Sequence, residues 1–276
     1  MTSEIKDFLR LCVHTQTTRA WDIKACIENY AAAGIHGITI WRNVLENQDL
    51  PEVKRMLEDF EMKPVSLCRG GFFPSVSFDK RKDAIRDNLL AIEQAAAIGA
   101  PMIVLVCGAD PEQSLERSRE QIAEGITRIL PAARAAKVKL AIEPLHPMYA
   151  GDRSAVNTLK QANDMAELIN SEWVGVAVDV YHLWWDERLK KEINRCGRHH
   201  HLFAFHICDW NVPTTDFLND RGLMGDGCIN VPEIRSWVED AGFRGYNEVE
   251  IFSDKYWATD QKEYLEEIKQ AYLEKS

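Results

Sequence analysis

The 276-residue sequence contains no long apolar run and no apolar segment near its start. A helix that spans a bilayer needs about 20 mostly apolar residues, and a secretory signal needs an apolar core close to the N-terminus. The sequence begins instead with MTSEIKDFLR, in which charged and polar residues predominate. We therefore expect a soluble, cytoplasmic protein with no membrane partner.

Paired cysteine spacings are also missing. The sequence has seven cysteines, an odd number, and no CxxC motif, which disfavours a zinc ribbon and a redox dithiol. Several of the cysteines lie inside apolar runs, where a free thiol behaves as a small hydrophobic group. Reduced thiols of this kind are typical of a cytoplasmic protein.

Positive charge is scarce relative to negative charge. The 33 lysines and arginines are outnumbered by 43 aspartates and glutamates, which gives a formal net charge of −10 and a pI near 5.4. Proteins that bind the phosphates of nucleic acids usually carry a basic face. The charge balance therefore argues against DNA or RNA as a partner.

Glycine-rich phosphate motifs are absent as well. No GxGxxG segment opens the first predicted helix, as a dinucleotide site on an open, doubly wound sheet would require. No glycine-rich segment follows the last two predicted strands, where many barrel enzymes bind phosphate. The second absence favours a substrate without a phosphate group.

The sequence does contain eight repeats of a short apolar run followed by a segment with helical periodicity. The predicted strands cover residues 9–15, 36–41, 63–69, 101–107, 138–144, 173–180, 201–208 and 245–252. The predicted helices cover 21–34, 50–60, 82–98, a segment ending at 137, 154–170 and 184–196, then one from 231 and a last one through Tyr264 and Tyr272. Pro51 lies near a helix start, and Gly34 and Gly99 end two helices, as these residues often do.

Alternating strands and helices of these lengths form a parallel sheet, and eight units fit a closed barrel. We find no linker, low-complexity tract or shift in composition. The prediction is therefore an α/β fold, a single-domain (β/α)8 TIM barrel over residues 1–276.

The ends of these strands carry the candidate functional residues, because barrel enzymes place catalysis at the carboxyl ends of their strands. The last polar residues of the eight strands are His14, Trp41, Arg69, Cys107, Glu143, Asp179, His206 and Glu250. A lone acidic residue in this position is more often a helix cap or an ion-pair member. Three carboxylates and one histidine on consecutive strands are harder to explain in that way, because the carboxylates repel one another unless a cation lies among them. Three oxygens and one nitrogen suit Mn²⁺, the ion we favour, with Mg²⁺, Co²⁺ and Zn²⁺ as alternatives.

Four segments resemble a known family. AIEPLHP, VAVDVYH, AFHICDW and VEIFS, in this order, are similar to the xylose isomerase-like TIM barrels, which include sugar phosphate isomerase/epimerases, ketose 3-epimerases, inosose dehydratases and, more distantly, endonuclease IV. The resemblance covers essentially the whole chain. It implies that the metal ligands are Glu143, Asp179, His206 and Glu250. It also implies that His182 faces the substrate and that Arg221 contacts substrate oxygens. Glu248 points to the same face of its strand as Glu250 but lies deeper in the barrel, so we rank it below Glu250 as a ligand.

The sequence departs from the ketose 3-epimerases at one point. These enzymes often carry a further substrate-binding glutamate shortly after the ligand on the fifth strand, but residues 144–149 contain none, and His146 is the candidate replacement. Trp41 and Arg69 are predicted to form a wall of the substrate pocket, with the planar fork of Arg69 suited to a phosphate or carboxylate. Asp209 lies just beyond a strand, where it either orients a ligand or substrate or caps the loop.

These residues predict a divalent-metal-dependent isomerase or epimerase of a keto sugar or derivative. Glu143 and Glu250 would remove and return a proton next to the carbonyl, through an enediolate bound to the metal. A dehydratase or lyase acting on a keto sugar or inosose is the alternative reaction, and a non-catalytic sugar-binding subunit is the alternative of another class. A nuclease like endonuclease IV is disfavoured, because it needs more histidine and glutamate ligands. Barrels of this kind often associate through their helices, so a homo-oligomer remains open.

Overall fold

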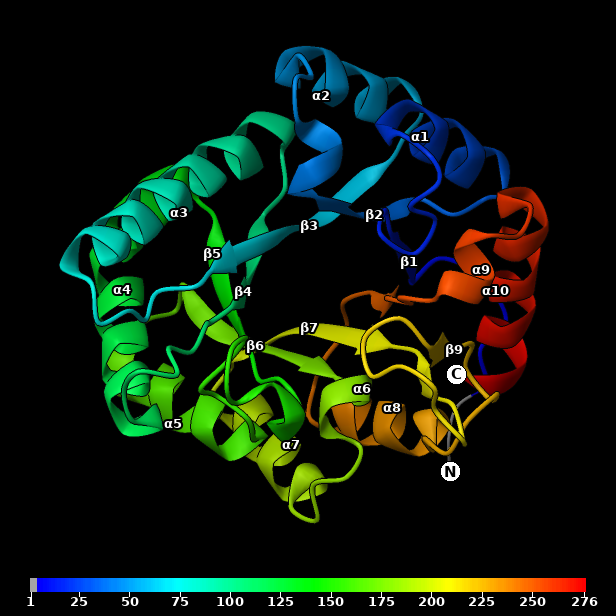
Figure 1. The fold of residues 1–276 in the computed structure, drawn as a ribbon. Helices are drawn as coiled ribbons and strands as arrows, with labels where there is room; N and C mark the ends of the chain where they lie inside the picture. Colours follow the sequence, from blue (N-terminus) through cyan, green and yellow to red (C-terminus); the bar gives the residue numbers. More distant parts are fainter. Residues whose placement is uncertain (1–3) are drawn as a thin grey trace.

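The computed structural model describes residues 4–276. Over these residues the chain forms a closed barrel of eight parallel strands inside a ring of helices (Figure 1). The strands are β1 (Leu11–His14), β2 (Gly37–Trp41), β3 (Lys63–Gly71), β4 (Met102–Val106), β5 (Lys139–Glu143), β6 (Val174–Asp179), β7 (Leu202–Ile207) and β10 (Asn247–Val249). The barrel closes between β1 and β10, the first and last of these strands. The predicted single-domain (β/α)8 barrel is confirmed.

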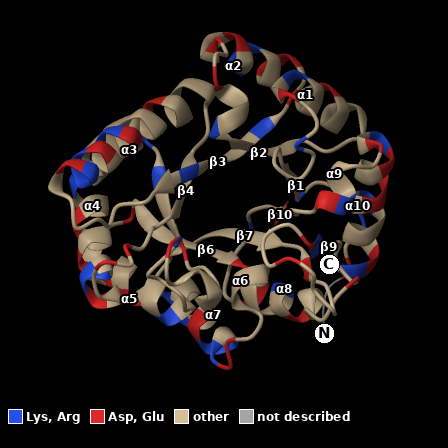
Figure 2. Cartoon of the chain, viewed as in Figure 1, with Lys and Arg blue, Asp and Glu red and all other residues tan. Residues whose placement is uncertain are grey.

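The helices surround the barrel, and acidic and basic residues are interspersed along them (Figure 2). The longer helices are α1 (Ile23–Ala32), α2 (Leu50–Asp59), α3 (Phe78–Ile98), α4 (Leu115–Ala136), α5 (Leu159–Ile169), α7 (Leu189–Arg198), α8 (Val231–Asp240) and α10 (Gln261–Lys275). Capping side chains set several helix starts: Ser77 accepts a hydrogen bond from the backbone of Lys80, and Ser114 accepts one from Arg117. No helix within residues 4–276 is both long and apolar enough to cross a membrane.

Two regions of the fold differ from the sequence-based prediction. The predicted helix over 184–196 is confirmed as α7 but begins five residues later, because the chain first forms the short helix α6 (Val180–Leu183) and a turn. A two-stranded antiparallel sheet of β8 (Asp209–Trp210) and β9 (Arg221–Gly222) was not predicted. Shorter elements complete the fold: η1 (Arg42–Leu45), η2 (Pro147–Tyr149) and α9 (Asp254–Trp257).

The interior of the barrel is lined by small and medium side chains below its carboxyl end. These residues are Cys68, Met102, Val104, Ala141, Ala177 and Ala204. Each of the three alanines precedes a polar residue by two positions on the same strand. Side chains two residues apart on a strand point to the same face. The polar residues therefore point into the barrel, as the alanines do.

Gly71 at the end of β3 permits a close approach between two strands. Its φ is +110°, and a Cβ atom there would lie 1.9 Å from the carbonyl oxygen of Val106 on β4. We expect Gly71→Ala to lower the free energy of unfolding by about 3 kcal/mol, measured by urea denaturation. Gly34→Ala is the matched control, because Gly34 also has a positive φ but nothing within 4 Å of the added atom. Equal losses in the two variants would show that the approach to β4 is not the cause.

Candidate metal centre

Four polar side chains from neighbouring strands meet at the carboxyl end of the barrel. Glu143 ends β5, Asp179 ends β6, His206 lies one residue before the end of β7, and Glu250 directly follows β10. All four side chains are buried. One donor atom from each lies within 4.8 Å of the donor atoms of the other three. The residues predicted to be ligands are therefore close enough to share one ion.

The unsatisfied atoms in this cluster fit a cation. Nδ1 of His206 and Oε1 of Glu143 are 3.0 Å apart, yet neither atom has a hydrogen-bond partner among the described residues. Buried polar atoms are nearly always paired, and donors that converge without pairing are what a metal site needs. Three carboxylates with one imidazole match the donor preferences of a hard to borderline divalent ion.

Burial and charge shift the protonation of the cluster. Burial raises the pKa of Asp179 to about 8, although the nearby Arg221 acts in the opposite direction. Burial opposes protonation of His206, but the attraction of Glu248 and Glu143 outweighs it and raises the pKa of this histidine to about 10. Protons therefore compete with a divalent cation for these donors, as is usual for metal ligands.

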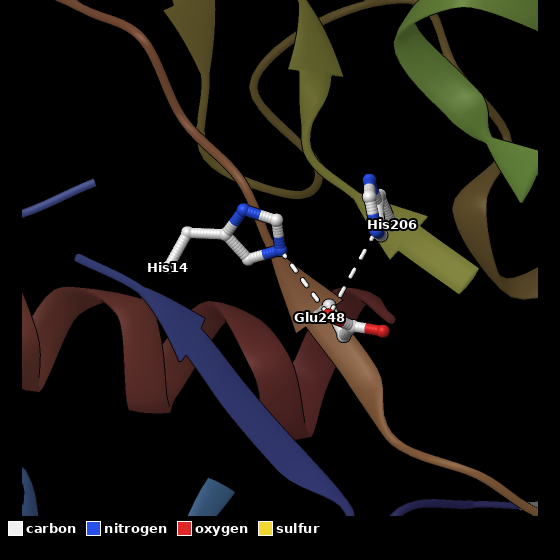
Figure 3. Close-up of side chains that lie close together, drawn as sticks. All are labelled: His14, His206 and Glu248. Carbon is white, nitrogen blue, oxygen red and sulfur yellow. Dashed lines mark ion pairs between the residues drawn. The ribbon is translucent and has the colours of Figure 1, made fainter. Parts of the chain in front are cut away.

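A second layer of polar residues supports the cluster (Figure 3). Oε2 of Glu248 on β10 lies 3.4 Å from Nε2 of His14 and 3.8 Å from Nε2 of His206, and both imidazoles point toward it. The hydroxyl of Thr39 donates a hydrogen bond to the same oxygen at 2.6 Å, and that of Ser66 lies 3.3 Å away. Glu248 thus contacts the back of the His206 ring, whose Nδ1 faces the candidate ligands.

His14 links this second layer to the cluster. Its Nδ1 lies 3.1 Å from Oε1 of Glu250, and it accepts a hydrogen bond from Nε1 of Trp41 at 3.2 Å. The sequence marked His14 as a strand-end residue but gave it no role. Thr39 and Ser66 were missed, because a hydroxyl within an apolar strand is not distinctive without knowledge of the neighbouring strands.

Arg221 lies against two of the candidate ligands. Its Nη1 donates to Oε2 of Glu250 at 2.9 Å and lies 3.4 Å from Oδ2 of Asp179, and its Nη2 lies 3.5 Å from Nε2 of His182. The guanidinium also packs over the ring of Tyr181, 4.2 Å from its centroid. The short strand β9 holds Arg221 in this place through its pairing with β8. Burial and the positive charge of Arg221 hold the pKa of His182 well below its usual value, so this imidazole is neutral.

His146 lies among aromatic rings at the edge of the cluster. Its ring centroid is 5.6 Å from that of Trp185 and 5.4 Å from that of Trp210, and its Nδ1 accepts a hydrogen bond from the backbone of Met148. Burial lowers the pKa of this half-buried imidazole. Its contact with a substrate stays a prediction.

Asp209 organises a loop. Its carboxylate is fully buried and accepts hydrogen bonds from the backbone amides of Trp210, Gly225 and Ile229, at 2.8 to 2.9 Å. These bonds occupy both carboxylate oxygens. Of the two roles predicted for Asp209, the structure favours loop capping over contact with a substrate.

A cavity of about 670 Å³ adjoins the cluster at the ends of β2 and β3. Trp41 and Arg69, the predicted pocket residues, both line it, together with Cys68. The thiol of Cys68 lies within 4.8 Å of donor atoms on His14 and Glu250. The cavity therefore approaches the candidate ligand Glu250 through Cys68 and is also lined by Arg69. Its size is typical of a small-molecule site.

Comparison with known proteins agrees with this architecture. A family model described as a xylose isomerase-like TIM barrel matches residues 27–275. An inosose isomerase of Halalkalibacterium halodurans is 24% identical over 281 residues, which cover 96% of this chain and 96% of that protein. The crystal structure of a protein from Sinorhizobium meliloti 1021 matches with a TM-score of 0.93 at 43% identity, covering 96% of this chain and 98% of that one. The crystal structure of an IolI protein with a bound zinc atom matches with a TM-score of 0.84 at 22% identity, covering 96% and 97%.

Proposed function

Because the chain belongs to the xylose isomerase-like TIM barrel family, we propose that it is a divalent-metal-dependent isomerase or epimerase of a keto sugar or sugar derivative. The observation that carries the proposal is the convergence of three carboxylates and one imidazole, with unpaired donor atoms, at the carboxyl end of the barrel. The similar H. halodurans protein is named for an inosose. An inosose is a cyclic polyhydroxy ketone, which supports a substrate of this chemical class.

The proposed ligands of the ion are Glu143, Asp179, His206 and Glu250. We favour Mn²⁺ because oxygen donors outnumber nitrogen three to one, and Zn²⁺ is the main alternative, since the similar IolI structure contains zinc. When bound, the ion supplies Lewis acidity that stabilises negative charge on an oxygen of the substrate.

The chain itself supplies the proton transfers. Glu143 and Glu250 come from β5 and from the end of β10, which are separated by two strands in the barrel. One carboxylate removes the proton from the carbon next to the carbonyl, and the other returns a proton from the opposite side. Arg221 and His182 lie beside Glu250 and Asp179 and are assigned to hydrogen bonds with substrate oxygens. Return of the proton to the same carbon epimerises the sugar, whereas return to the neighbouring carbon isomerises it.

The test is proton NMR of candidate keto sugars and inososes with the metal-loaded protein in deuterated water. Because the second carboxylate returns a proton that comes from solvent, we expect the product to carry deuterium at the reacting carbon. Turnover without deuterium incorporation contradicts the two-carboxylate scheme. An unsaturated product would favour the dehydratase alternative, and binding of sugars without exchange or turnover would favour the sugar-binding subunit.

Glu248→Gln tests the second layer of polar residues. Carboxylates behind a metal-binding histidine orient its ring and raise its basicity, and their loss typically lowers metal affinity about 10–100-fold. We expect a decrease of this size in Mn²⁺ affinity, measured by competition with a chelator. Glu192→Gln is the matched control, because Glu192 is equally buried but lies on α7 outside the barrel, paired with Arg195. Equal affinities in the two variants would show that Glu248 does not support the site.

A further inference from the structure

Arg69 is an arginine without a partner in a cavity that adjoins the candidate metal centre. Its guanidinium makes no ion pair and no side-chain hydrogen bond with residues 4–276. The neighbouring Arg42 is fully engaged, because its two terminal nitrogens bind both oxygens of Asp87 at 2.8 Å and its Nε donates to Gln94. The carboxylate of Asp87 thus neutralises Arg42 and leaves the charge of Arg69 available.

The surroundings of Arg69 hold the side chain in place but do not occupy its donors. The guanidinium carbon lies 4.3 Å from the ring centroid of Phe72, a cation–π contact that covers one face of the group. The N–H groups lie in the plane of the guanidinium and remain free to donate. Partial burial lowers the pKa of Arg69, which reflects the cost of a desolvated charge without a counter-ion. Binding of an anion would supply the missing counter-ion and remove this cost, which favours the bound state.

The position of Arg69 fits one end of a bound substrate. Arg69 follows Cys68, whose thiol lies within 4.8 Å of a donor atom of Glu250, and both residues line the same cavity of about 670 Å³. A sugar whose carbonyl lies at the candidate metal ligands would extend through this cavity. Its far end would then reach the guanidinium.

We propose that Arg69 binds an anionic group of the substrate, a carboxylate or a phosphate, at the end away from the reacting carbonyl. The inference rests on the proposed function and names the class of substrate as an acidic keto sugar derivative. A carboxylate is favoured, because one planar fork matches its two oxygens. Glu46 also lines the cavity and repels a doubly charged phosphate more strongly than a singly charged carboxylate.

The experiment compares three ketoses that differ only at carbon 6: D-fructose, D-fructuronate and D-fructose 6-phosphate. Dissociation constants are measured by calorimetry on the Mn²⁺-loaded protein and on its Arg69→Gln and Arg69→Lys variants. We expect D-fructuronate to bind the unmodified protein at least about tenfold more tightly than D-fructose, because hydrogen bonds to charged groups contribute more than neutral ones. Arg69→Gln should remove this preference, so that D-fructuronate and D-fructose bind this variant with similar affinity. Arg69→Lys should keep part of it, since the charge remains but the fork is lost.

Arg117→Gln on α4 is the matched control, because it removes the same charge at an exposed residue that does not line the cavity and should keep the full preference. Failure of D-fructuronate to bind the unmodified protein, equal affinity for it and D-fructose, or a preference that survives in Arg69→Gln each overturns the anion site. Tighter binding of D-fructose 6-phosphate that depends on Arg69 supports the anion site and overturns the choice of carboxylate. Binding is measured separately from deuterium incorporation, so a failure of the proposed reaction is distinguishable from a failure of this inference.

Discussion

His206→Ala is expected to abolish stoichiometric binding of divalent metal, and catalytic activity with it. His206 supplies the single nitrogen of the cluster, and its Nδ1 lies 3.0 Å from Glu143 and 3.9 Å from Glu250. Without its imidazole, three buried carboxylates remain, and less positive charge lies beside them to balance their repulsion. Loss of a direct ligand should exceed the effect of losing an outer contact, so we expect metal affinity to fall by more than about 100-fold. Asp179→Ala should give the same result.

The measurements are metal content by elemental analysis after dialysis against metal-free buffer, and deuterium incorporation into a keto sugar. His201→Ala is the matched control, because His201 precedes β7 and so lies at the opposite end of the same strand. His206→Asn keeps a polar side chain of similar size, and thermal unfolding in the presence of a chelator shows whether either variant has lost the fold. Unchanged metal content in folded His206→Ala and Asp179→Ala would refute the assigned site.

The barrel and the convergence of the four candidate ligands were predictable because side chains along a strand alternate between its two faces. Ala141 and Glu143 lie two residues apart on β5, and Ala204 and His206 repeat the spacing on β7. In both strands the small residue and the polar residue point to the same face, so the polar side chain faces the barrel interior at the carboxyl end of the strand. The carboxyl ends of parallel strands lie on the same side of the barrel, so the fold alone predicts that these side chains lie close together.

Contacts that depend on the strand register where the barrel closes, or on irregular loops, were not predictable in this way. His14 and Glu248 meet only because β1 pairs with β10, and nothing in either segment alone indicates the other. Arg221 was identified through the family resemblance, but its approach to Glu250 depends on β9, a strand of two residues formed by the pairing of a loop with itself. The sequence left two roles open for Asp209. Its polarity beyond a strand fitted contact with a ligand or substrate and also loop capping, and the backbone amides that donate to its carboxylate favour capping.

The absence of a phosphate motif and the free charge of Arg69 both concern whether the substrate carries an anionic group. The missing glycine-rich segment predicted an unphosphorylated substrate, which is compatible with a neutral sugar or with a carboxylate. Arg69 has no counter-ion within residues 4–276, and this observation supports the acidic substrate that we propose.

Glu143→Gln and Glu250→Gln are expected to lower turnover about 10²–10⁴-fold, because each removes a carboxylate that transfers a proton. The amide oxygen of glutamine can still contact an ion, so both variants should keep measurable metal binding. If the two carboxylates act on opposite faces of the substrate, each variant retains one working base. One epimer should then still exchange its proton with deuterated water in Glu143→Gln, and the other epimer should do so in Glu250→Gln.

Proton NMR of each epimer separately, at saturating Mn²⁺, measures this exchange. Glu192→Gln is the control for replacing a buried carboxylate away from the barrel interior. Complementary exchange in the two variants, with no interconversion of the epimers in either, is the result that two opposed carboxylates require. Loss of exchange for the same epimer in both variants would mean that a single group carries the proton in both directions. The other carboxylate of the pair Glu143 and Glu250 would then serve metal binding alone.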